Sequence, residues 1–186
     1  MKSVLIVVDM QNDFLLPDGR LSLGHDTGGL ISRVAEKVRG FDGPVILVRD
    51  VHEQGDCEFA AFPPHCLAGT PGSEIAAPVL AALEGKIFLK LDKKSYTSHE
   101  AAHTIVNTIF RAGAPARVCV TGICTHICVS EVTGDIVNLS KNLHNTVPEI
   151  SIDTALVDDF DPEMAAFALR RMQSLYGVKV SETVRA

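Results

Sequence analysis

The segment 121–129 holds two cysteines, Cys124 and Cys128, four positions apart. It follows an apolar run typical of a buried strand, residues 117–120, and precedes residues with helical spacing. A thiol at a strand-to-helix turn lies near the positive end of the helix dipole, which favours the nucleophilic thiolate. The segment therefore contains a candidate nucleophile.

Acidic and basic side chains follow three other apolar runs. Asp9 ends the first run, Asp50 ends the second, and Lys93 and Lys94 come after the third. Ligands of open α/β sheets bind beyond the carboxyl ends of the strands, so these side chains are expected at one edge of the sheet. A carboxylate there can take the thiol proton, and a lysine can favour the charged thiol. Each residue alone is more often a helix cap or a solvated charge, and only the combination favours a catalytic site.

His52 and His65 form a second group with Asp50. Asp50 and His52 are two apart and point to the same side of an extended segment, and His65 follows two prolines that fix the backbone. A mixed carboxylate and imidazole set suits a zinc, iron or manganese ion that keeps open positions. The same spacing permits a polar loop with incidental histidines, so the metal site is one of two interpretations.

The two cysteines of the segment also allow a rival interpretation, a structural zinc site or a redox pair. Their spacing is not CxxC, and no second cysteine pair lies at zinc-ribbon distance. Cys57 and Cys66 are nine apart and interrupted by a Phe-Pro-Pro element. The pattern therefore disfavours this rival.

The elements that must position these residues alternate along the chain. Apolar runs of strand length lie at 4–8, 44–48, 87–91, 118–121, 150–152 and 178–180. Their hydrophobicity is continuous, which predicts strands buried on both faces. Helical spacing lies between them: Leu30, Val34 and Val38 before Gly40; Ala102, Ile105, Ile109 and Ala112 before Gly113; and Met164, Phe167, Leu169 and Met172 between Asp161-Pro162 and Gly177. The sequence predicts a single α/β domain over 1–186, with a doubly wound, mostly parallel sheet of about six strands and helices on both faces.

Composition excludes several classes of function. The chain has 186 residues, 46% hydrophobic and 22% charged, with a net charge of −6. Interspersed charges of this balance argue against nucleic acid or an anionic membrane as the main partner. No run approaches the roughly 18 apolar residues of a membrane span. Five cysteines without an export signal are expected to be reduced thiols, so the predicted localisation is cytoplasmic.

The chain contains four short motifs, which follow one another in sequence. Residues 7–14 look like a D-x-Q-x-x-F opening, and residues 50–52 with 62–70 look like a metal-loop pattern. Residues 93–96 match K-x-x-Y, and residues 122–129 match G-V-x-T-D-x-C-V. Together they resemble the isochorismatase-like cysteine hydrolases, and within them the nicotinamidase (pyrazinamidase) branch. The resemblance covers almost the whole chain, and four motifs at suitable intervals make it specific.

The resemblance implies a role for each residue of the catalytic group. Cys128 is the expected nucleophile, Asp9 the group that moves the proton, and Lys93 the positive charge. The resemblance also implies a non-proline cis peptide bond between Ile123 and Cys124. The backbone N–H groups of Cys124 and Cys128 are then the expected donors to the developing oxyanion.

It also implies a metal and a substrate. The metal is a divalent transition ion, zinc first and iron or manganese as alternatives, that receives the pyridine nitrogen and orients the substrate. Phe14 and Phe62 are expected to sandwich the substrate ring, with plain core aromatics as the alternative. The implied metal ligands are Asp50, His52, His65 and, as in some members of the family, Glu58.

The expected reaction is hydrolysis of nicotinamide to nicotinate and ammonia through a cysteine thioester, a step of NAD salvage. A related hydrolase for another small amide and a catalytically silent binding protein on the same fold are the alternatives. The chain departs from the family at His126, where Asp is frequent, and at Gly134, which inside a helix costs roughly 1 kcal/mol relative to Ala. These departures bear on helix packing and on oligomer contacts, and they leave a homo-oligomer open.

Overall fold

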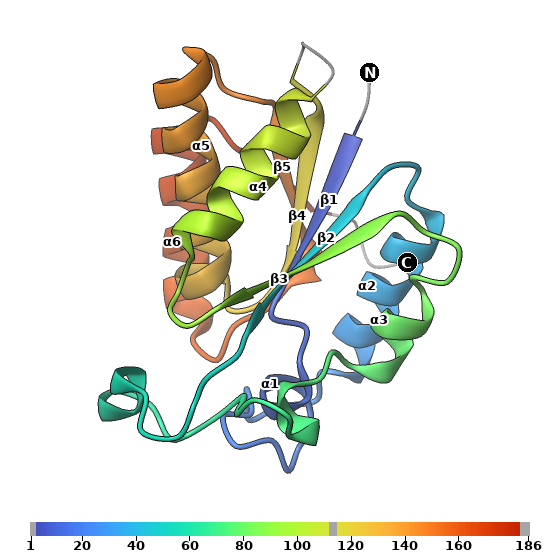
Figure 1. Cartoon of the computed structure of the whole chain (residues 1–186), viewed down its shortest axis with the longest axis vertical. Coiled ribbons are helices and arrows are strands. Elements are labelled where there is room, and N and C mark those ends of the chain that lie inside the picture. Colours follow the sequence, from blue (N-terminus) through green and yellow to red (C-terminus); the bar gives the residue numbers. More distant parts are fainter. Residues whose placement is uncertain (1–2, 112–114, 183–186) are drawn as a thin grey trace.

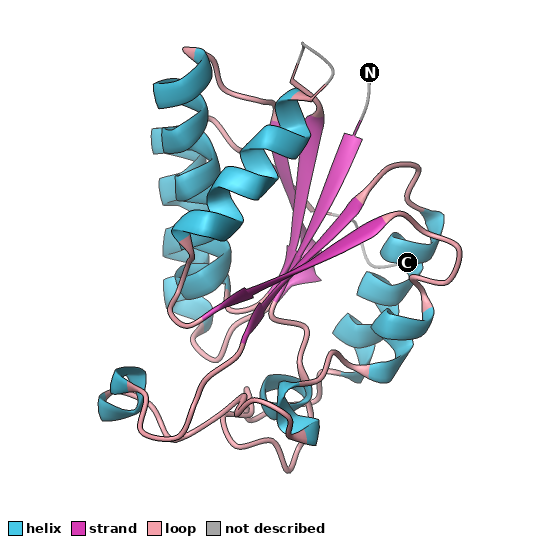
Figure 2. Ribbon diagram, viewed as in Figure 1, coloured by secondary structure: helices cyan, strands magenta, loops and turns pink. Residues whose placement is uncertain are grey.

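A six-stranded parallel sheet forms the centre of the computed structural model, which describes residues 3–111 and 115–182 (Figure 2). Every strand pairs with its neighbours in the parallel sense, so the prediction of a doubly wound α/β sheet is confirmed. The strands are β1 Ser3–Val8, β2 Val45–Asp50, β3 Phe88–Lys93, β4 Arg117–Gly122, β5 Ile150–Val157 and β6 Lys179–Ser181.

The order of the strands, β3-β2-β1-β4-β5-β6, reverses between β1 and β4. At this seam Val8 pairs with Val48 on one side and with Gly122 on the other, and Asp50 pairs with Lys93 one strand further out. The carboxyl ends of four strands therefore meet at one edge, and the reversal leaves a crevice there in which open α/β sheets bind ligands.

Helices cover the two faces of the sheet in chain order (Figure 1). One face carries α2 Gly28–Gly40 and α3 Ala77–Ala81, and the other carries α4 His99–Phe110, α5 Ser130–His144 and α6 Pro162–Tyr176. The short helix α1, Asn12–Leu15, lies beyond the carboxyl ends of the strands (Figure 1) and packs into the same apolar cluster as α2 and α3. Each face has its own apolar cluster, with alternate residues of the central strands pointing to opposite sides. No helix among the described residues is long and apolar enough to cross a membrane.

The last helix shows how local sequence sets the boundaries of an element. The Asp161 side chain accepts hydrogen bonds from the N–H groups of Glu163 and Met164, both at 3.0 Å, and Pro162 occupies the first turn. Gly177 ends the helix with φ of 70°. In α5, Gly134 lies under α6, because a Cβ there would stand 2.9 Å from the Tyr176 hydroxyl. The tip of the Tyr176 side chain thus packs against this glycine.

Three expectations about the elements need correction. The strand β3 is not buried on both faces: Ile87, just before it, is 80% exposed, and Phe88 and Leu89 are also exposed, because β3 is the edge strand. The strand β5 runs on to Val157, well past Ile152. The helix α2 includes Gly40 rather than ending before it. The predicted helix positions Ala112 and Gly113 lie outside the described residues.

Two irregular segments leave the carboxyl edge of the sheet. The first, here called the metal loop (residues 51–70), follows β2 and contains one short 3₁₀ turn, Cys57–Ala60. The second, here called the nucleophile turn (residues 122–129), follows β4 and contains a single π-helical turn, Thr125–Val129, before α5. It starts at Gly122, whose φ of 112° and close approach to the Val8 carbonyl leave no room for a side chain. The peptide bond between Ile123 and Cys124 is cis, as expected.

Candidate active site

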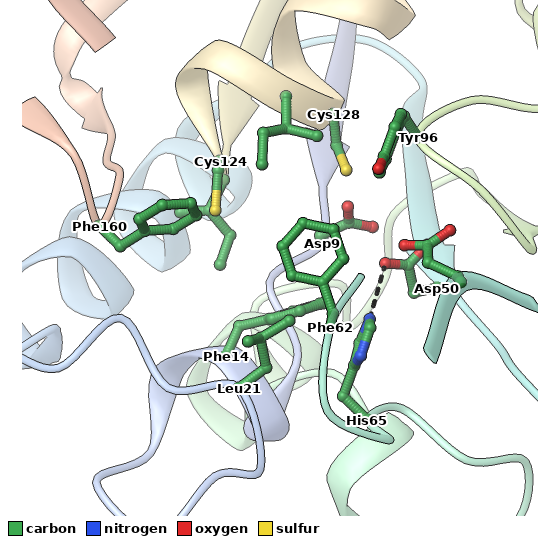
Figure 3. A pocket seen from close by; sticks show the side chains of 13 residues that line it. Asp9, Phe14, Leu21, Asp50, Phe62, His65, Tyr96, Cys124, Cys128 and Phe160 are labelled. Carbon is green, nitrogen blue, oxygen red and sulfur yellow. Dashed lines mark ion pairs between the residues drawn. The ribbon is translucent and has the colours of Figure 1, made fainter. Parts of the chain in front are cut away.

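A pocket opens at the seam between β1 and β4 (Figure 3). The space between its lining side chains, with the open mouth included, is about 410 Å³. The nucleophile turn forms one wall and the metal loop the other, and most of the lining is apolar. The side chains that line it are Asp9, Phe14, Leu21, Asp50, Glu58, Phe62, His65, Tyr96, Ile123, Cys124, Ile127, Cys128 and Phe160.

Asp9, Lys93 and Cys128 meet at the base of the pocket. Lys93 Nζ lies 2.9 Å from Asp9 Oδ2 and donates to Cys128 Sγ at 3.4 Å. One ligand atom each of Asp9, Asp50 and Cys128 lies within 4.8 Å of the other two. All four residues are buried. The strand ends thus bring a thiol, a carboxylate and an ammonium within proton-transfer range.

Burial and charge set the protonation of the two charged groups nearest the thiol. Burial alone would lower the Lys93 pKa, but the charges of the Asp9 and Asp50 carboxylates outweigh it and raise the Lys93 pKa well above its usual value. Burial raises the pKa of Asp9 to about 7, even though the Lys93 charge opposes this shift. The ammonium is therefore permanent, and Asp9 changes its protonation state near neutral pH.

The thiol itself behaves differently from the expectation based on the helix dipole and on Lys93. Burial raises the pKa of Cys128 well above its usual value, and the nearby Asp9 and Asp50 charges add to the rise. The Lys93 charge opposes the shift without reversing it. The resting thiol is therefore protonated, and it could act as a nucleophile only if a base removed its proton. Asp9 is the carboxylate placed to do so.

The metal loop brings three potential ligands to Asp50, the last residue of β2. Asp50, His52, Glu58 and His65 each offer an atom within 4.8 Å of the others. His52 Nε2 and His65 Nε2 lie 3.9 and 3.8 Å from Asp50 Oδ2, and Figure 3 shows His65 pointing at Asp50. His52 Nε2 is buried and has no hydrogen-bond partner among the described residues. A buried orphan nitrogen beside carboxylates fits a metal ligand, so the residues present suit a divalent transition ion.

The other nitrogens of both imidazoles are held by acceptors. His52 Nδ1 lies 3.2 Å from Asp56 Oδ2, and His65 Nδ1 lies 2.8 Å from the Pro63 carbonyl. A carboxylate and a carbonyl only accept, so each Nδ1 carries the proton. Each Nε2 then faces Asp50, in the arrangement that tunes metal-binding histidines. Asp56 also accepts from the Glu58 N–H at 3.2 Å, so it positions two members of the cluster.

Two residues of α1 and the segment before it anchor the metal loop. Gln11 donates through Nε2 to the Asp50 carbonyl at 2.7 Å and accepts the Asp50 N–H at 2.8 Å through Oε1. Asp13 accepts the Cys66 N–H at 2.7 Å. Both are buried, and both belong to the opening motif, in which the sequence analysis assigns roles only to Asp9 and Phe14. Gln11 and Asp13 could have been predicted as anchoring residues, because both carry hydrogen-bonding side chains within that motif.

Cys124 contributes more than its backbone to the pocket. Its side chain lines the wall, and burial raises its thiol pKa, so it remains a neutral thiol. All five cysteines are free, and the residue groups suited to a metal contain Cys128 but not Cys124 within the described part of the chain. The geometry therefore gives the rival structural zinc or redox pair no support.

The aromatic residues gather around the metal side of the pocket. Phe14 and Phe62 both line it, with ring centroids 5.4 and 6.4 Å from that of His65. Tyr96, the last residue of K-x-x-Y, also lines it and lies edge-on to Phe62. Phe160, which follows β5, lines the opposite side of the pocket. No motif in the sequence predicts this position for it.

The chain is similar to known proteins over nearly its whole length. The model of the isochorismatase domain matches residues 3–184. The chain belongs to the isochorismatase family. An uncharacterized isochorismatase family protein of Bacillus subtilis (strain 168), PncA, is 28% identical over 98% of this chain and 100% of its own length.

Two crystal structures extend the likeness to proteins named for their activity. The nicotinamidase/pyrazinamidase PncA from Bacillus subtilis has a TM-score of 0.83 and 26% identity, covering 98% of this chain and 100% of that one. The pyrazinamidase of Pyrococcus horikoshii in complex with zinc has a TM-score of 0.75 and 27% identity over the same shares. Family membership and these amidase neighbours together indicate a hydrolase that acts on amide bonds.

Proposed function

We propose that this isochorismatase-family protein is a nicotinamidase, which hydrolyses nicotinamide to nicotinate and ammonia as a step of NAD salvage. The observation that carries the proposal is the junction of two groups in one pocket. A buried thiol with a carboxylate and an ammonium lies beside a carboxylate and imidazole cluster, and apolar and aromatic side chains line the space between them. The first group suits acyl transfer and the second suits binding of a ring nitrogen.

The proposed reaction begins when Cys128 attacks the amide carbonyl. Asp9 takes the thiol proton as the sulfur–carbon bond forms, and it gives the proton to the nitrogen as ammonia leaves. Water then attacks the thioester, Asp9 removes a proton from it, and the thiol is regenerated with release of the carboxylate. Lys93 stays charged and holds Asp9 in place, and the backbone N–H groups of Cys124 and Cys128 bind the oxyanion.

Asp50, His52, His65 and Glu58 would hold the metal. A divalent transition ion, with zinc proposed first, supplies a binding point for the pyridine nitrogen when it is bound there. Phe14 and Phe62 pack against the ring and exclude water from its faces. The substrate is thereby held at one end by its nitrogen and presents its amide to Cys128 at the other.

The test is ammonia release from nicotinamide, with nicotinate identified by chromatography. We expect turnover by the wild type and a loss of at least about 10⁴-fold in kcat for Cys128→Ala, the size seen when a nucleophile is removed. The matched control is Cys57→Ala, because Cys57 is an exposed thiol outside the pocket. Full activity of Cys128→Ala would exclude the mechanism.

The metal part of the proposal has its own test. Dialysis against a chelator and exchange into metal-free buffer should lower turnover, and added zinc should restore it. Metal content is determined on the same samples, so retention of full turnover after verified removal would contradict this part. A panel of other small amides follows, since equal or faster turnover of an amide without a pyridine ring would favour the related hydrolase instead.

A further inference from the structure

Asp159 is a buried carboxylate that the proposed reaction does not use. Its side chain is fully buried in the loop after β5, and it does not line the pocket. A buried carboxylate is costly unless hydrogen bonds compensate for its lost hydration. Its partners therefore show what its burial supports.

Those partners connect the nucleophile turn to the start of α6. Asp159 Oδ2 accepts the backbone N–H of His126 at 2.8 Å and lies 2.7 Å from His126 Nδ1. Asp159 Oδ1 accepts the backbone N–H of Asp161 at 3.0 Å. One carboxylate thus joins two segments that are separate in sequence.

The neighbouring residues reinforce the connection through their backbones. Thr125 donates both its N–H and its hydroxyl to the Asp158 carbonyl, each at 3.0 Å, and the Asp158 N–H donates to the Gly122 carbonyl at 3.3 Å. Thr125 and His126 are therefore both fastened to the β5–α6 loop. They lie between Cys124 and Cys128, whose backbone N–H groups are the proposed oxyanion donors.

The connection also sets one wall of the pocket. Phe160, adjacent to Asp159, lines the pocket, and its ring centroid is 5.2 Å from that of His126 in an edge-on contact. Figure 3 shows Phe160 beside Cys124, on the side of the pocket away from His65. The His126 ring thus touches both the buried carboxylate and the wall residue.

We propose that Asp159 is a positioning residue for amide hydrolysis, which holds the nucleophile turn through His126 so that the oxyanion donors keep their aim. This inference rests on the proposed function, because it assigns Asp159 to the same reaction. Donors to an oxyanion contribute mainly in the transition state, so a loosened turn lowers kcat and leaves KM nearly unchanged.

The first experiment compares three substitutions in the nicotinamide assay. Asp159→Ala should lower kcat by about 10–100-fold with KM within about twofold, since small misplacements of catalytic groups have effects of this size. Asp159→Asn should recover most of the loss, because an amide oxygen can still accept from the His126 N–H. His126→Ala should lower kcat by about 3–10-fold, because the backbone bond to Asp159 remains.

A matched control separates the role of Asp159 from general damage to the loop. Asp158→Asn removes the same charge one residue earlier, where the partly exposed side chain pairs with His25 at 3.0 Å. The Asp158 side chain also accepts the Asp159 N–H at 2.9 Å, and the amide oxygen of asparagine can keep this bond. The substitution should leave kcat within twofold of the wild type. A loss in Asp158→Asn as large as in Asp159→Ala would overturn the inference.

A probe of the oxyanion site adds a readout that stability does not move. The Cys128 thiol adds to pyridine-3-carbaldehyde: sulfur bonds to the carbonyl carbon, the thiol proton goes to its oxygen, and a hemithioacetal forms. In Asp159→Ala the inhibition constant of the aldehyde should rise about tenfold or more, while the Kd of nicotinate stays within twofold. If Asp159→Ala does not fold, His126→Ala carries the same comparison with a smaller rise.

The outcomes distinguish this inference from the proposed function. A wild type that releases no ammonia from nicotinamide refutes the proposed function. A wild type that turns over, together with kcat and aldehyde inhibition within twofold of wild type in the folded variants Asp159→Ala and His126→Ala, refutes the positioning role alone.

Discussion

The two walls of the pocket are held in different ways. The nucleophile turn is bound to the loop after the adjacent strand β5, largely by backbone hydrogen bonds such as that from Thr125 to Asp158. The metal loop closes on itself where the His52 N–H donates to the Cys66 carbonyl at 3.0 Å. Buried side chains then tie it to the region of α1, Gln11 at Asp50 and Asp13 at Cys66.

The difference follows from length and from the position of the strands. A short turn between a strand and a helix can satisfy its backbone against the neighbouring strand end. A loop of the length of residues 51–70 leaves the sheet, so buried polar side chains must replace those backbone partners. The nucleophile wall thus depends on the geometry of the sheet and on one buried carboxylate, Asp159, whereas the metal wall depends on several individual side chains.

Lys93 pairs with Asp50 next to the metal loop and donates to Cys128 in the nucleophile turn. Because it contacts both walls, its removal should have the largest effect. Lys93→Ala should lower kcat/KM by at least about 10³-fold and destabilise the fold by about 3–5 kcal/mol, since Asp9 and Asp50 are left buried without their cation. Steady-state kinetics and urea unfolding measure the two effects. The control is Lys94→Ala, whose exposed pair with Glu53 should contribute less than about 1 kcal/mol. Equal effects in both variants would show that Lys93 does not couple the walls.

Asp56→Ala should affect the metal wall alone. It removes the acceptor of His52 Nδ1 and of the Glu58 N–H, so the Kd of zinc should rise by about 10–100-fold in competition with a chromophoric chelator. The kcat at saturating zinc should change by less than about threefold. Asp159→Ala should give the reverse result, with an unchanged Kd of zinc. Glu53→Gln is the control. An unchanged Kd of zinc in Asp56→Ala would remove Asp56 from this role, and a raised Kd of zinc in Asp159→Ala would contradict the independence of the walls.

The dependence of kcat/KM on pH should reflect the ionisation of Asp9, next to the nucleophile turn. We expect this effect to be the smallest of the three. Asp9 must be deprotonated to take the thiol proton, and its pKa is raised to about 7, so kcat/KM should fall about tenfold per pH unit below that value. Stability should respond in the opposite sense. Folding favours protonated Asp9, so its contribution to the free energy of unfolding is present at low pH and is lost as the pH rises through about 7. A flat kcat/KM between pH 5.5 and 8 would remove Asp9 from this role.

The sequence predicts the sheet and most of the pocket because both depend on local signals. Continuous apolar runs mark the strands, and the polar residue after each run marks the edge where Asp9, Asp50 and Lys93 meet. The fifth strand shows the limit. Asp153 and Thr154 interrupt its apolar pattern, so the strand was expected to end at Ile152, and the loop after Val157 received no function.

Partners that are distant in sequence were the other limit. His126 and Asp159 are 33 positions apart, and the sequence around either residue does not predict that they pair. The exposure of β3 likewise depends on its place in the strand order, which its own apolar run does not encode. The raised pKa of Cys128 depends on how many groups bury the thiol, whereas the sequence shows only its charged neighbours.

The strand order also bears on how the protein is synthesised. Translation proceeds from the amino terminus, and β1, β2 and β3 lie side by side in the sheet. The ion pairs of Lys93 with Asp9 and Asp50 join residues that have all left the ribosome before Cys128. The charged half of the site can therefore assemble on the nascent chain first, and the thiol then arrives at partners that are already in place.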